Sequence, residues 1–224
     1  ASYSGGTEET KYPVPEYLYN DSLLDDVNYL YNKGVLLDYI LKPVVENEPT
    51  NLSSVYASEQ VLKDCYSREY VLSHYQIPEK NDAYFPEDMF IEGLENNLQA
   101  NILPILEEHP ETNFTLFFPP YSILYWYEYV QNSQMDAVMY EYGYFMEKLL
   151  VYENVELFFF PAEKEIVTNL DLYADTGHYK QEINRYMTKC FADGTNRITA
   201  ENYKEKLSEM KKLIDTYDYE ALFS

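Results

Sequence analysis

The sequence has few of the residues that nucleotide, metal and disulfide sites depend on. Its 224 residues include 7 glycines and 2 cysteines, and the glycines form no phosphate-cradling loop. Cys65 and Cys190 are too few for a disulfide framework and lack the ligand spacing of a zinc site. Both lie at apolar positions of expected helices. We therefore expect two buried thiols, no metal site and no cofactor.

Positive charge is also scarce. The chain has 16 lysines and arginines against 39 aspartates and glutamates, a formal net charge of −23. Such a surface repels a phosphate backbone and has no basic stripe to bind one, so nucleic acid is excluded as a partner. The acidic residues are spread along the chain instead of gathered in a tail, which is typical of a solvated surface.

Long apolar runs are absent as well. No stretch approaches the roughly 18 to 20 apolar residues that span a bilayer, and no cationic start leads into the apolar core of a signal peptide. We expect no transmembrane segment in these residues. The chain opens with Ala1 and not with methionine, so we expect a preceding part to have been removed, and a missing leader does not argue against export.

The order of apolar patterns predicts an α/β fold. We expect residues 1–85 to form an irregular lead-in and helical region, and residues 86–224 to form an α/β portion continuous with it. Residues 113–118 and 155–160 are short, apolar on both faces and closed by prolines, as buried parallel strands are. Helical spacing surrounds them at residues 90–105, 135–149, 183–191 and 201–214. Alternating strands and helices predict a parallel sheet in a three-layer α/β/α sandwich of flavodoxin-like type.

One short string combines an acid with a base near the expected sheet edge. Asp175 precedes His178 by three residues, close enough to act as the orienter and the base of a hydrolytic triad. The strands end at Phe118 and Phe160, and ligands bind beyond the carboxyl ends of strands in open α/β sheets. The spacing alone also fits a simpler interpretation, in which Asp175 caps a helix and His178 binds a backbone group.

The residues around this string resemble a known superfamily. Asp175-Thr176-Gly177-His178-Tyr179, between a Phe-rich strand and an amphipathic helix, resembles the last conserved block of SGNH/GDSL-type hydrolases. The run from Phe118 through Pro119, Pro120, Tyr121 and Ser122 to Tyr125-Trp126 is similar to a bacterial branch of exported or membrane-anchored proteins. Relatives of that kind include the teichoic-acid D-alanine transfer protein and alginate-type O-acetyltransferases. The resemblance covers residues 90–195.

This resemblance implies an activity and a location. In the superfamily an Asp-x-x-His supplies the acid and base of a Ser-His-Asp triad, which implies catalytic roles for Asp175 and His178. Ser122, Tyr121 and Tyr179 are expected at the pocket or rim, beyond the ends of the two strands. The implied substrate is an acylated glycan of the cell envelope or a small ester. The implied location is extracellular, or the surface of a bacterial cell.

The chain departs from the family pattern at the nucleophile. It contains no Gly-Asp-Ser and no Gly-x-Asn-Asp block, so the opening βαβ portion is expected to be missing, with a serine upstream of this chain. Ser4 lies at a flexible terminus, a poor scaffold for a nucleophile, and Ser122 is expected to cap a helix or line the pocket. These residues alone are therefore expected to be inactive. The alternative is a non-catalytic binding or structural module whose 26 tyrosines present a glycan or protein surface.

Overall fold

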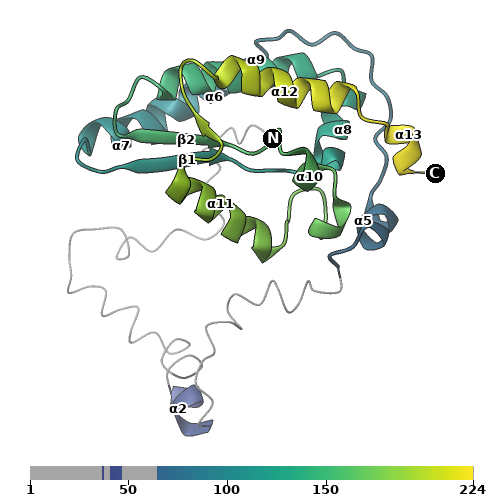
Figure 1. The fold of residues 1–224 in the computed structure, drawn as a ribbon, viewed down its shortest axis with the longest axis horizontal. Coiled ribbons are helices and arrows are strands. Elements are labelled where there is room, and N and C mark those ends of the chain that lie inside the picture. The colour runs from purple at the N-terminus through teal and green to yellow at the C-terminus, as the bar shows by residue number, and fades with distance from the viewer. Residues whose placement is uncertain (1–36, 38–40, 47–64, 224) are drawn as a thin grey trace. The chain divides into compact units, whose positions relative to one another are not determined.

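The computed structural model describes residues 37, 41–46 and 65–223 (Figure 1). The chain divides into two compact units, of which one spans Gly6–Val61 and the other Leu62–Ser224 together with Ala1–Gly5. In the first unit the described structure includes the short helix α2 (Lys42–Glu46). Ser4 lies outside the described residues.

A small open sheet organises the larger unit. Strands β1 (Phe114–Phe118) and β2 (Val155–Phe159) pair in parallel, with Phe114 opposite Val155 and Phe118 opposite Phe159. The two predicted strands and their parallel pairing are therefore confirmed. The order of strands in the sheet is β1-β2-β3.

The third strand makes the sheet mixed. Strand β3 (Arg197–Ile198) pairs antiparallel to β2, so the prediction of a purely parallel sheet was wrong. Two residues are too short to show an alternating pattern, which is why the sequence did not indicate this strand. It follows a tight return of the chain through Gly194 and Asn196, both at positive φ.

Strand β2 is buried on both faces. Leu157 and Phe159 belong to one apolar core, whereas Phe158 and Phe160 pack into a second core with residues of helix α11 (Gln181–Asp193). Successive side chains of a strand point to opposite faces, so an uninterrupted apolar run fills both cores. In Figure 1, helices α9 (Met135–Leu149) and α12 (Tyr203–Asp215) lie on one side of the sheet and α11 lies on the other.

A proline interrupts the long helix that precedes β1. The predicted helix over residues 90–105 is divided into α6 (Ile91–Asn97), the π-helical turn η3 (Leu98–Ile102) and α7 (Leu103–Glu108), with Pro104 in the first turn of α7. Proline lacks the N–H that an α-helical ladder needs. The ladder changes at this point, and the helix continues beyond the predicted end.

The other helices of the larger unit are short, and α8 is the longest of them. None of the helices in the described part of the chain is long and apolar enough to cross a membrane. These remaining elements are α5 (Arg68–His74), α8 (Ile123–Gln131), α10 (Lys164–Val167), the 3₁₀ turn η4 (Leu170–Leu172) and α13 (Tyr219–Leu222).

Candidate functional site

Two segments meet beyond the carboxyl ends of β1 and β2. The backbone N–H of Ser122, four residues past β1, donates to the Thr176 carbonyl oxygen at 2.9 Å, and its hydroxyl donates to the same oxygen at 2.8 Å. The hydroxyl of Tyr173 donates to the Pro120 carbonyl oxygen at 2.6 Å. The structure thus brings the exit of β1 against the loop that follows β2, as the positions of the strand ends predicted.

The loop that carries Asp175 and His178 is closed at its base. Tyr173 and Tyr179 form an isolated antiparallel bridge. The N–H of Ala174 donates to the His178 carbonyl oxygen at 2.9 Å. The acid and the histidine therefore lie within a turn that is closed by main-chain hydrogen bonds.

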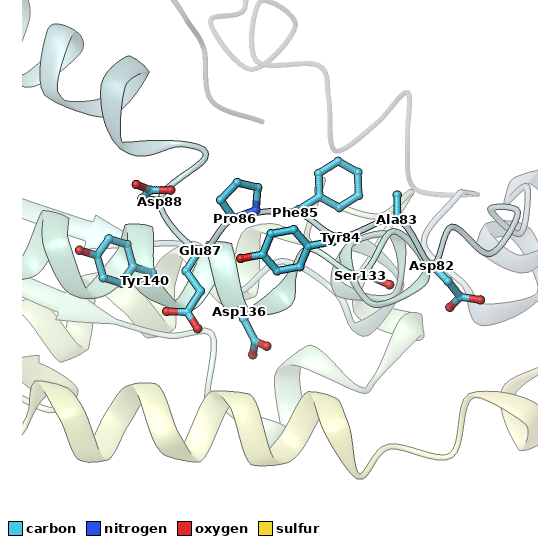
Figure 2. A pocket seen from close by; sticks show the side chains of 10 residues that line it. All are labelled: Asp82, Ala83, Tyr84, Phe85, Pro86, Glu87, Asp88, Ser133, Asp136 and Tyr140. Atoms are coloured by element: carbon cyan, nitrogen blue, oxygen red, sulfur yellow. The ribbon is translucent and has the colours of Figure 1, made fainter.

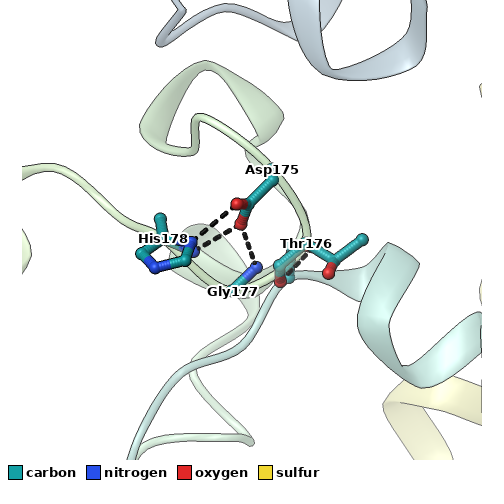
Figure 3. Close-up of polar contacts among 5 residues, drawn as sticks. Asp175, Thr176, Gly177 and His178 are labelled. Atoms are coloured by element: carbon teal, nitrogen blue, oxygen red, sulfur yellow. Dashed lines mark hydrogen bonds and ion pairs between the residues drawn. The ribbon is translucent and has the colours of Figure 1, made fainter. Parts of the chain in front are cut away.

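Asp175 contacts His178 through both carboxylate oxygens (Figure 3). Its Oδ1 accepts from the backbone N–H groups of Gly177 at 2.8 Å and His178 at 2.7 Å, and its Oδ2 lies 2.6 Å from the ring Nδ1 of His178. This is the compact turn that an aspartate forms when it accepts hydrogen bonds from residues two and three positions later. The two predicted catalytic residues are thus in direct contact.

The electrostatics of this pair keep the acid ionised. Burial acts to raise the pKa of the Asp175 carboxyl, but hydrogen bonds from the N–H groups of His178 and Gly177 and from the His178 ring outweigh it and lower that pKa. An ionised carboxylate at Nδ1 holds the proton on that nitrogen and leaves the lone pair on Nε2. The His178 side chain is 77% exposed, and no residue in the described ranges donates a hydrogen bond to Nε2. The ring can therefore accept a proton from a group that approaches from solvent.

Ser122 lies where a helix cap was predicted, but its hydroxyl is used elsewhere. It occupies the N-cap position of α8, and its side chain makes no capping hydrogen bond. The residue is completely buried and its hydroxyl is engaged by Thr176. It lies beneath the rim and is not exposed in an open pocket.

The two tyrosines named from the sequence lie beside the loop. The Tyr121 ring is within 3.5 Å of the position that a Cβ on Gly177 would take, and its centroid is 4.4 Å from that of Tyr125. Tyr179 packs edge-on against Tyr173, with centroids 6.4 Å apart. Both are half-buried. Tyr173 itself was missed from the sequence, since nothing in its spacing distinguishes it from other apolar tyrosines.

A nucleophile for this pair is not found among the described residues. No serine, threonine or cysteine side chain within residues 65–223 forms a hydrogen bond with His178.

Of the two thiols, Cys190 is buried as expected and Cys65 is only partly buried. The described residues also include no group of three or more His, Cys, Asp or Glu side chains that could bind a metal ion.

A wide hollow lies elsewhere, at the start of α9 (Figure 2). It has a volume of about 610 Å³ and includes no residue of the Asp175–His178 loop. Its lining comes from residues 82–88 and from Ser133, Asp136 and Tyr140. The Ser133 hydroxyl donates to the Asn81 carbonyl oxygen at 2.9 Å. This hydrogen bond connects the segment that precedes residue 82 to the turn between α8 and α9.

Comparisons of the chain with protein-family models, with curated proteins and with solved structures found no match. The geometry of the Asp175–His178 pair and of its loop therefore carries the functional interpretation.

Proposed function

We propose that the chain is part of an SGNH-like acyl-ester hydrolase or O-acyltransferase in which Asp175 and His178 are two members of the catalytic triad. The observation that carries the proposal is the 2.6 Å contact between Asp175 Oδ2 and His178 Nδ1, with the rest of the ring open to solvent. Its place beyond the carboxyl end of β2 supports the proposal, because ligands bind there in open α/β sheets.

In the proposed reaction His178 moves a proton twice. Nε2 takes the proton of a serine hydroxyl as its oxygen attacks the ester carbonyl carbon, and Asp175 stabilises the imidazolium that forms. The tetrahedral intermediate then collapses, the alcohol leaves with the proton from Nε2, and an acyl-serine remains. Water regenerates the serine in a hydrolase, whereas a sugar hydroxyl does so in a transferase. We place this serine outside the part of the chain that the structure describes.

The resemblance of the sequence supports the proposed substrate and location. We infer an O-acylated glycan of the cell envelope or an extracellular glycan as the substrate, and a location outside the cell or on a bacterial surface. The same resemblance supports a three-layer α/β/α sandwich, with α11 as one outer layer and α9 with α12 as the other. Among the described strands β1 has a neighbour on one side only, and we propose that further strands pair with its open edge.

Hydrolysis of short aryl esters by the full-length protein tests this function. The variant His178→Ala removes the base, and we expect kcat/KM to fall by about 10²-fold or more. His109→Ala is the matched control, because His109 Nδ1 lies 3.7 Å from Glu111 in an exposed acid–histidine pair far from the loop in sequence. Unchanged turnover in His178→Ala would exclude the triad role.

The alternative is a non-catalytic module that keeps the loop without a nucleophile. The observation that favours it is the lack, within residues 65–223, of a nucleophilic side chain bonded to His178. Labelling with a serine-directed fluorophosphonate separates the two functions. A catalytic serine is labelled in the wild type and much more slowly in His178→Ala, whereas a binding module is not labelled in either.

A further inference from the structure

Among the described residues outside the aromatic ones, Ser122 is the one polar residue that is completely buried. A buried hydroxyl costs free energy unless it is hydrogen-bonded, and an alanine at the same position would not carry that cost. Its hydroxyl serves neither the first turn of α8 nor another side chain. Its one hydrogen bond is to the loop of the Asp175–His178 pair.

Ser122 forms two hydrogen bonds with the centre of that loop. The N–H and the hydroxyl of Ser122 converge on one acceptor, the carbonyl oxygen of Thr176, which lies 54 positions away in the sequence. Thr176 is the residue directly after Asp175. The peptide between the acid and the histidine is therefore fixed to the segment that leaves β1.

A second hydrogen bond restrains the start of the same loop. Tyr173 is completely buried, and its hydroxyl donates to the Pro120 carbonyl oxygen at 2.6 Å. Pro120 and Ser122 belong to one short segment after β1. Two buried hydroxyls thus connect the exit of β1 to the loop, one at Tyr173 and one at Thr176.

We propose that Ser122 and Tyr173 are positioning residues that hold the Asp175–His178 pair in its productive geometry. The inference rests on the proposed function of that pair. With the Thr176 peptide fixed, the N–H groups of Gly177 and His178 meet Oδ1 of Asp175, which leaves Oδ2 to meet Nδ1. Without either hydroxyl, fewer hydrogen bonds hold the loop to the exit of β1, although the Ser122 N–H still donates to Thr176. We therefore expect Oδ2 of Asp175 to be less well aligned with Nδ1 of His178.

The test compares Ser122→Ala with Ser133→Ala in the full chain. Ser133 is the matched control because its hydroxyl also donates to a distant carbonyl, that of Asn81, at 2.9 Å and across 52 positions, at the other end of α8. Two NMR measurements report on the pair without any substrate. They are the ring ¹⁵N shifts of His178, which identify the tautomer, and the titration of the Asp175 carboxyl carbon.

In the wild type and in Ser133→Ala we expect the proton to stay on Nδ1 and the pKa of Asp175 to stay below its ordinary value. In Ser122→Ala we expect the ring ¹⁵N shifts to move towards a mixture of tautomers and the pKa of Asp175 to rise. Tyr173→Phe keeps the ring and removes only the hydroxyl, so it should move both signals in the same direction. If Ser122→Ala does not fold, the ring shifts and the titration of Tyr173→Phe test the proposal in its place.

Wild-type-like ring shifts and titration in a folded Ser122→Ala, or in Tyr173→Phe where Ser122→Ala does not fold, would overturn the proposal. Where the wild type hydrolyses aryl esters, Ser122→Ala should lower kcat by about tenfold with little change in KM, since a displaced base slows the chemical step. A full-length wild type without esterase or acyltransferase activity contradicts the proposed function. The NMR comparison then still decides whether Ser122 and Tyr173 position the pair.

Discussion

One carboxylate of Asp175 holds both the main chain and the side chain of His178. Its Oδ1 accepts from the His178 backbone N–H at 2.7 Å while its Oδ2 lies 2.6 Å from the ring Nδ1. The first contact fixes the position of the His178 backbone and the second fixes the rotation of its ring. Because both contacts come from one carboxylate three residues earlier, the pair forms within a single turn.

Replacing Asp175 by asparagine tests the second of these contacts. The asparagine oxygen can still accept the backbone N–H groups, but its NH₂ group then faces Nδ1 and favours the tautomer with the proton on Nε2. That tautomer cannot accept a proton from a nucleophile, so we expect kcat/KM for aryl esters to fall by about 10²-fold to 10⁴-fold. Asp193→Asn is the control, because Asp193 Oδ1 accepts the Thr195 N–H at 2.9 Å in a similar turn without a histidine. Equal activity in the two variants would contradict the role of Asp175.

The lowered pKa of Asp175 predicts how its contribution to stability depends on pH. The folded pKa lies below the ordinary value, so the native state binds the proton less readily than the unfolded chain. The contribution is therefore fully present above the unfolded pKa, near 4, and is lost as the pH falls through the folded pKa. The side chain is 54% exposed, and solvent screening limits the effect to about 1 kcal/mol or less.

Urea unfolding of the wild type and of Asp175→Asn, at pH 7 and at pH 3, measures this contribution. The difference in free energy of unfolding between the two proteins should be larger at pH 7 than at pH 3. A difference that grows as the pH falls would reverse the sign and exclude the assignment.

Local patterns made the strands and the pair predictable, whereas distant contacts did not show in the sequence. Strands β1 and β2 can be recognised in the sequence as apolar runs that end at a proline. Asp175 and His178 are only three positions apart, so their contact forms within one turn. The role of Ser122 depends on the carbonyl oxygen of a residue 54 positions away. Every residue has a backbone carbonyl, so the sequence does not indicate which one accepts this hydrogen bond. Its place directly before a helix favoured a cap, and tertiary packing used the hydroxyl elsewhere.

Strand β3 escaped prediction for a related reason. Arg197 and Ile198 pair with Phe158 and Leu157 of β2, and a two-residue segment shows no periodicity of its own. Its position depends on the end of α11 and on the free edge of β2, neither of which is encoded in those two residues. The mixed character of the sheet therefore follows from three-dimensional closure and not from a local signal.

The two cores on either face of β2 predict a pair of equally damaging substitutions. Phe158 and Phe159 are each about 1% exposed and point to opposite faces. Each truncation to alanine should lower the free energy of unfolding by about 3 to 5 kcal/mol. Phe117→Ala on β1 is the matched control, because Phe117 is 44% exposed and should lose less than half as much. Chemical denaturation measures all three, and a mild effect of Phe158→Ala alone would mean that the core against α11 contributes little.

The end of helix α11 predicts a contrast between two glycines. Gly194 follows the helix at φ +78° and donates its N–H to the Cys190 carbonyl oxygen at 2.8 Å. A side chain is strained in that left-handed conformation, so Gly194→Ala should cost about 1 kcal/mol, although no atom beyond Gly194 and its two chain neighbours lies within 4 Å of the new Cβ. Gly93 in α6 also has open space around a new Cβ, and its φ is negative. Gly93→Ala should therefore raise the free energy of unfolding by about 0.5 to 1 kcal/mol.

Thermal unfolding measures both variants. We expect Tm to fall in Gly194→Ala and to rise in Gly93→Ala, by about 2 to 4 °C per kcal/mol. Equal shifts of the same sign would show that backbone conformation does not separate the two positions.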